Sequence, residues 1–166
     1  MKTIRQVLYD TIPAAAQSIL KDSGIDIAPM NGKAHYDMVA VIGFSGDGFG
    51  GSLGFAAEHS FVNKAFGESD TSLSDSWLGE VANLLLGRLK NSLLSYGVEY
   101  RLAIPMVLHG LQLRVRADEG RLTQFQFKSN AGQACVWVDA NWKMDKELSM
   151  VDADQHSKAE GEIMLF

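Results

Sequence analysis

The sequence predicts an α+β domain in which about six strands form an antiparallel sheet and two main helices pack on one face of it. Three observations lead to this class. Apolar residues recur at helical spacing in two segments, roughly 3–22 and 74–95. Most of the remaining chain has the composition or the alternation of strands. Short turns rich in glycine and acidic residues join these strands, and short turns favour hairpins, which build antiparallel sheets.

The first helix is expected over about Thr3–Asp22, because its apolar residues fall on one face. Pro13 lies inside this segment. Since proline removes a backbone donor, we expect a kink or an interruption near Tyr9 or Asp10. A loop rich in Asp, Pro, Asn and Gly then leads to the first strands.

A hairpin is expected next. Asp37–Ser45 and Gly50–Ala57 have the composition of strands, and the intervening Gly46–Gly48 supplies turn residues. His59–Phe66 fits a short helix that ends at a glycine. The polar link 68–74 then leads into the second long helix.

The period of the sequence changes after this helix. Glu99–Ala103 and Val107–Gly110 are expected to be extended around a proline. Three stronger strands follow at Leu111–Ala117, Arg121–Lys128 and Gln133–Asn141, separated by turn residues. One of these three is expected at an edge of the sheet.

The composition bounds the function. The 166 residues fit one domain, with 46% hydrophobic and 21% charged residues, as in ordinary globular proteins. A net charge of −5 without a basic stripe argues against a nucleic-acid partner and against membrane binding through a basic helix. The single cysteine, Cys135, cannot form an internal disulfide, so a reduced cytoplasmic setting is the simplest expectation.

The second long helix, Ser74–Ser95, carries the most informative pattern. Its apolar residues form one stripe, whereas Glu80 and Asn83 lie about 60° apart on the opposite face. Gly87 lies on the same outward face, where a glycine costs about 1 kcal/mol relative to alanine, so something is expected to approach the backbone there. Ser74 or Asp75 is expected to cap the start of the helix.

Three stretches of this chain resemble the CheC/CheX/FliY family of chemotaxis phosphatases. LGEVANLLLGRLKNSL resembles the family's signature helix, an E-x-x-N followed by a small residue. VIGFSGDGFGGSLGFA resembles its early hairpin, and RLAIPMVLHG its segment after the helix. The resemblance covers about residues 1–142, which gives one domain over 1–143 and an acidic extension over 144–166.

The family has pseudo-twofold halves, and residues 3–57 and 74–140 of this chain show a faint repeat of a helix followed by strands. The position in the first helix that corresponds to Glu80–Asn83 falls near Asp10–Pro13, which lacks the Glu and the Asn. The chain is therefore most similar to the one-site, CheX-like branch.

The resemblance implies hydrolysis of the aspartyl phosphate of a CheY-like response regulator. Asn83 would orient the attacking water, and Glu80 would pair with the receiver lysine. The receiver would bring its own Mg²⁺, so this chain would need no cofactor. The resemblance also implies a homodimer formed by joining sheets. Further residues expected to meet the partner are Ser76, Gly87, Lys90 and Leu94.

Two alternatives from other classes stay open. The chain could be a non-catalytic adaptor that binds a receiver or the flagellar switch, or a small-molecule-binding or structural domain with an accidental E-x-x-N. Gly46–Gly51 fits G-x-G-x-x-G and Gly50–Gly54 fits G-x-S-x-G, but both motifs need a following helix where a strand is expected. No metal site is expected, because ligand spacing is missing among His35, His59, His109 and His156.

Overall fold

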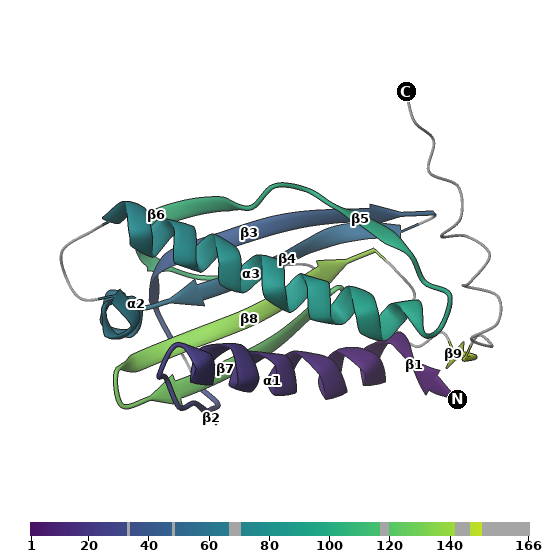
Figure 1. The fold of residues 1–166 in the computed structure, drawn as a ribbon, viewed down its shortest axis with the longest axis horizontal. Helices are drawn as coiled ribbons and strands as arrows, with labels where there is room; N and C mark the ends of the chain where they lie inside the picture. Colours follow the sequence, from purple (N-terminus) through teal and green to yellow (C-terminus); the bar gives the residue numbers. More distant parts are fainter. Residues whose placement is uncertain (33, 48, 67–70, 117–119, 142–146, 151–166) are drawn as a thin grey trace.

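The computed structural model describes residues 1–32, 34–47, 49–66, 71–116, 120–141 and 147–150. In these residues two long helices, α1 (Ile4–Asp22) and α3 (Thr71–Leu94), lie side by side across one face of a sheet (Figure 1). The short helix α2 (His59–Phe66) lies at one end of this layer. The predicted α+β class, with helices on one face of an antiparallel sheet, is confirmed.

The main sheet has seven strands in the described part of the chain, all paired antiparallel. Their order is β2-β7-β8-β4-β3-β5, and β6 also pairs with β3. The strands are β2 (Ala28–Pro29), β3 (Tyr36–Gly46), β4 (Phe49–Ala57), β5 (Tyr100–Leu102), β6 (Met106–Leu113), β7 (Leu122–Ser129) and β8 (Gly132–Ala140). β5 pairs with the end of β3 and β6 with its first half, so the two share one edge of the sheet.

The predicted hairpin is present as β3 and β4, which pair from Met38–Ala57 to Gly46–Phe49. The glycine-rich run is therefore strand and turn, as expected, and not the start of a helix. Gly54 lies directly opposite Trp137 on β8. A Cβ on Gly54 would come within 2.1 Å of the Trp137 ring, so only glycine lets this ring lie across the strand.

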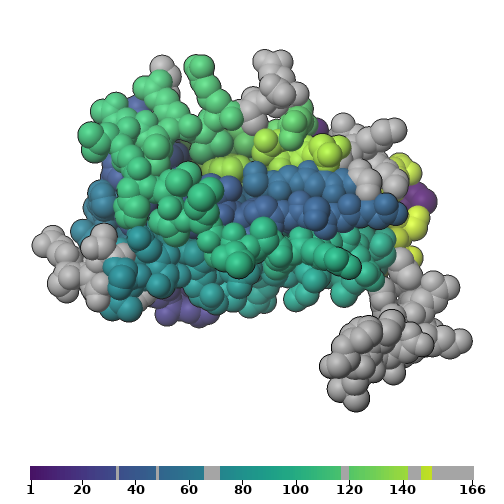
Figure 2. Space-filling model, turned by 90° about the horizontal axis from the view of Figure 1, so that it is seen from above, coloured from purple at the N-terminus to yellow at the C-terminus, as the bar shows by residue number. Residues whose placement is uncertain are grey.

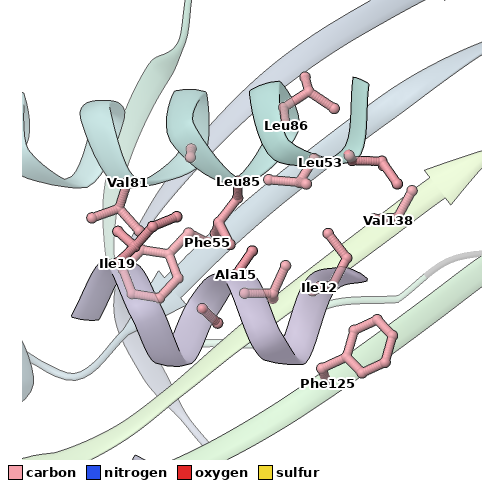
Figure 3. Packing of buried hydrophobic residues seen from close by; sticks show 14 of the residues in the cluster. Ile12, Ala15, Ile19, Leu53, Phe55, Val81, Leu85, Leu86, Phe125 and Val138 are labelled. Atoms are coloured by element: carbon pink, nitrogen blue, oxygen red, sulfur yellow. The ribbon is translucent and has the colours of Figure 1, made fainter. Parts of the chain in front are cut away.

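The main core lies between the two long helices and the sheet (Figure 3). Ile12 and Ile19 of α1 and Leu85 of α3 meet Phe55 and Val138 of the sheet there. A smaller buried cluster of Tyr36, Val39, Ala56 and Cys135 lies apart from this core. Burial raises the pKa of the Cys135 thiol to about 11, which suits a packing residue better than a nucleophile.

Two helix predictions were wrong in detail. α1 continues through Pro13 as one element, because its buried face and its capping box outweigh the lost hydrogen bond. In that box the Thr3 hydroxyl accepts a hydrogen bond from the Gln6 backbone N–H at 3.2 Å. The side-chain Oε1 of Gln6 accepts one from the Thr3 backbone N–H at 2.8 Å. α3 begins at Thr71, so Ser74 and Asp75 lie inside the helix and not at its cap.

The strand predicted over Leu111–Ala117 was also wrong. β6 already begins at Met106 and ends at Leu113, and residues 114–116 are not in a strand. A register shift occurs where β6 pairs with the start of β3, and Gln112 there has a φ of 54°. The pairing continues past this irregularity to Leu113 and stops there, because the partner strand β3 begins opposite it at Tyr36, although the alternating pattern of the sequence continues.

Most of the predicted acidic extension, 144–166, lies outside the described residues. Within it, Glu147–Leu148 forms β9, which pairs with β1 (Lys2–Thr3), and Leu148 is buried in the main core. None of the described helices combines the length and the hydrophobicity that a membrane span requires.

Candidate functional site

The outward face of α3 carries the predicted pair. Glu80 and Asn83 are both exposed, on the side of the helix that faces away from the core. Neither side chain forms a hydrogen bond or an ion pair with any residue that the structure describes. A carboxylate and a carboxamide are thus held one turn apart and ready for a partner.

The opposite face of α3 fixes the helix on the core. Val81 and Leu85 point toward α1 and the sheet (Figure 3), and Leu86 is fully buried in the same core. The predicted stripe is confirmed, since each of its leucines and its valine is buried: Leu78, Val81, Leu85 and Leu89. Burial of one such side chain contributes about 1.5–3 kcal/mol, so this face determines where Glu80 and Asn83 stand.

Three polar contacts from three different elements add to this packing. Near the start of α3, Asp75 Oδ1 lies 2.8 Å from His109 Nε2 on β6. Trp77 Nε1 donates to Ser23 Oγ at the end of α1 at 3.1 Å. The buried Tyr100 hydroxyl of β5 donates to the Leu86 carbonyl at 3.1 Å. These contacts limit sliding and rotation of α3 and so orient its outward face.

Sequence reasoning missed these contacts, because their partners are far apart in the chain. The Trp77 ring packs on the core, edge-on to Phe55 at a centroid distance of 6.0 Å. Asp75 was expected as a possible cap and instead faces His109.

The remaining predicted partner residues differ in their surroundings. Ser76 is exposed, but its hydroxyl already donates to the Ser72 carbonyl at 2.9 Å. Lys90 and Leu94 are half-buried and line an open groove of about 710 Å³. Arg101 of β5 lines the same groove and was not predicted. This groove continues the outward face of α3 toward its carboxyl end.

Gly87 lies one turn beyond Asn83, and a Cβ built on it would meet nothing within 4 Å. No neighbour in the described structure therefore requires a glycine here. We expect Gly87→Ala to raise the free energy of unfolding by about 0.5–1 kcal/mol, because alanine favours the helix. Urea unfolding measures this change. Gly87→Trp should unfold at nearly the wild-type urea concentration yet lose partner binding; unchanged binding would show that no partner approaches this turn.

The counterpart position on α1 offers no second pair. Asp10 forms an ion pair with Lys2 at 2.6 Å, and Pro13 has no polar side chain. Among the described residues, no group of three His, Cys, Asp or Glu side chains is placed to hold a metal ion. The chemical groups of the candidate site are therefore one carboxylate and one carboxamide.

A family model identifies the family of this chain. The family model described as chemotaxis phosphatase CheX matches residues 38–128, more than half of the chain, including most of β3 and the whole of β4 and α3. The chain belongs to the CheX family. It is thereby a member of a family of chemotaxis phosphatases. No curated protein matches the sequence.

Solved structures share the CheX fold. The chemotaxis protein CheX from Vibrio vulnificus is 22% identical with a TM-score of 0.72, over 82% of this chain and 98% of that one. A CheC-like superfamily protein from Shewanella sp. PV-4 is 23% identical with a TM-score of 0.72, over the same shares. The CheX–CheY–BeF3–Mg²⁺ complex from Borrelia burgdorferi matches with 16% identity and a TM-score of 0.63, over 81% and 97%.

Proposed function

We propose that this CheX-family protein hydrolyses the aspartyl phosphate of a CheY-like response regulator. The observation that carries the proposal is the exposed pair Glu80–Asn83, which has no partner among the described residues and stands on a helix fixed by its core face and three polar contacts. The family model and the CheX–CheY complex from Borrelia burgdorferi support the choice of partner.

Positioning alone can drive this reaction, because an acyl phosphate is an activated substrate. The attacking water must lie in line behind phosphorus, on the side opposite the aspartyl oxygen that leaves. The Asn83 carboxamide suits this task because it can accept a hydrogen bond from the water and donate one to a phosphoryl oxygen. It does not ionise near neutral pH, so its role is orientation and not general base catalysis.

Glu80 has a different role in the proposal. Its carboxylate pairs with the receiver's phosphate-binding lysine and so fixes the approach of α3. The i, i+3 spacing brings both side chains to the partner from one face. The Mg²⁺ that neutralises the phosphoryl oxygens belongs to the receiver, and this chain adds no metal ligand to it.

The test is the loss of phosphate from a phosphorylated CheY-type receiver of the same organism, with and without this protein at equal Mg²⁺. We expect a faster loss that depends on the protein concentration. Binding to the receiver without acceleration would show an adaptor instead, and neither binding nor acceleration would contradict both readings.

Glu80→Ala should weaken both receiver binding and turnover, because it removes one charge from the docking contact. Association should also become less sensitive to ionic strength, since charge pairs steer encounter most strongly at low salt. Stopped-flow association rates at two salt concentrations measure this. Glu80→Gln, which keeps the size but not the charge, is the matched control; equal salt dependence in all three proteins would contradict a charged contact.

We also propose that the protein is a homodimer joined through sheet edges. Among the described residues β6 pairs with β3 alone, and β2 with the following Met30 covers β7 only from Gln126 to Lys128, so both outer strands have backbone groups available to a second copy. β8, one of the three strands considered for an edge, is central. The competing expectation is a monomer whose sheet edge is covered by Ile163–Phe166 of the tail, and these residues lie outside the described part of the chain.

Sedimentation at micromolar concentration tests the assembly. One chain has a mass of 18.1 kDa, so a dimer should appear at twice this value, about 36 kDa. A mass that stays at that of one chain over the whole concentration range would contradict the dimer.

A further inference from the structure

An exposed apolar side chain lies in a link that packs against α3 one helical turn from Asn83. Ile104, in the three-residue link between β5 and β6, is 89% exposed. An isoleucine this exposed adds little hydrophobic stabilisation to the core. Single exposed apolar residues are common, so the surroundings of Ile104 must show whether it binds a partner. Figure 2 looks onto this edge of the molecule, where β5 and β6 lie along α3.

The link that carries Ile104 is held on both sides. The Ala103 N–H donates to the Gly43 carbonyl of β3 at 2.9 Å. Pro105 lies against α3 at Gly79, where a Cβ would contact the proline ring at 3.6 Å. Ile104 is therefore fixed between a bound backbone and a rigid proline, and it needs little ordering before a partner covers it.

Gly79 is one helical turn, about 6 Å along the axis, from Asn83. Any partner that brings a phosphoryl group to Asn83 must cover the surface around it. An ordinary interface buries about 800 Å² on each partner, a disc of about 16 Å radius. A disc of that size centred on Asn83 includes the link beside Gly79.

Leu84 stands on the other flank of the pair. It directly follows Asn83 on α3 and is 41% exposed, although its neighbours Leu85 and Leu86 are fully buried. The polar pair is thus bordered by one apolar side chain on the strand side and one on the helix side. Apolar side chains around a polar contact exclude water from it, as at the centres of other protein interfaces.

We propose, on the basis of the proposed function, that Ile104 and Leu84 are docking residues. They pack against an apolar patch beside the phosphorylation site of the receiver domain. They add affinity and exclude water, whereas Glu80 and Asn83 orient the reaction. The receiver is favoured over a second copy of this chain as the occupant, because the two residues border the exposed pair and the docked receiver must cover them.

The test compares Ile104→Ser with Leu111→Ser. Leu111 is also apolar and 93% exposed, but it lies seven residues further along the chain, about 23 Å away by strand rise. The probe is a CheY-type receiver of the same organism, loaded with beryllofluoride and Mg²⁺, whose Kd is measured by calorimetry. Turnover of the phosphorylated receiver gives kcat and KM, and sedimentation gives the mass.

Ile104→Ser should raise Kd and KM about 10-fold or more and leave kcat within about twofold, because burial of one isoleucine is worth that factor. Leu84→Ser should act in the same direction, and Leu111→Ser should keep the wild-type Kd, KM and kcat for the receiver. Ile104→Ser and Leu111→Ser should unfold at the wild-type temperature, since the replaced side chains are 89% and 93% exposed.

Wild-type affinity in Ile104→Ser would overturn this inference and leave the proposed function intact. A lower mass in Ile104→Ser with unchanged receiver affinity would also overturn it, in favour of a second copy. If the wild type binds the receiver but does not hydrolyse its phosphate, and Ile104→Ser binds more weakly, the docking role is supported and the phosphatase is refuted. No receiver binding by the wild type would overturn both.

Discussion

Asn83→Ala is expected to slow the dephosphorylation of a phosphorylated CheY-like receiver by about 10²-fold or more. Alanine can neither accept a hydrogen bond from the attacking water nor donate one to the phosphoryl group. The side chain is exposed and forms no hydrogen bond or ion pair with the described residues, so the free energy of unfolding should stay within about 0.5 kcal/mol of the wild type.

Single-turnover decay of the phosphorylated receiver, at saturating concentrations of each protein, isolates this effect from binding. Asn83→Gln is the matched variant, because it keeps the carboxamide but moves it by about one methylene. It should recover little of the rate, since orientation depends on distances well below 1 Å. Wild-type decay with Asn83→Ala at saturation would refute the assignment of this residue.

Leu85→Ala, two residues further along the same helix, should have the opposite profile. Leu85 is fully buried between α1 and the sheet (Figure 3), so its truncation leaves a cavity and should cost about 2–5 kcal/mol of stability. The folded fraction should retain most of its activity at low temperature, because the outward face of α3 is unchanged.

Urea unfolding gives the stability of Leu85→Ala. Its neighbour Leu84→Ala is the control, since a substitution of this half-exposed leucine should change the free energy of unfolding much less. Equal losses in the two variants would mean that α3 is not packed through Leu85 as described.

The class of the fold and most of its elements were predictable from the sequence, because their signals are local. The period of 3.6 in α3 and the alternation in β7 and β8 each follow from which side of an element is buried. The turn glycines between β3 and β4 mark their hairpin directly. Elements of this kind can be predicted without knowing which distant residues they contact.

The rest depended on contacts between distant segments. The start of α3 could not be predicted. Asp75 could either cap the helix or lie inside it and pair with another element, and its partner His109 is 34 residues away. The passage of α1 through Pro13 depends on how much surface that helix buries on the sheet, which no local pattern contains.

The candidate site was likewise predictable only in part. The common face of Glu80, Asn83 and Gly87 followed from helical spacing, and the structure leaves all three accessible. Their chemical roles came from the resemblance and stay predictions. Arg101 lines the groove at the carboxyl end of this face, and Pro105, next to Ile104, lies against Gly79 of α3; nothing in the spacing of α3 could indicate either contact.

The contacts of α3 with α1, β5 and β6 have a consequence for the speed and entropy of association. A helix attached to three other elements opens only together with them, so its backbone amides should exchange with solvent near the rate of global unfolding. The partner then meets a recognition element whose backbone is already ordered. The entropy lost on docking falls mainly on the side chains of Glu80 and Asn83, and a surface that needs no refolding suits brief, repeated encounters.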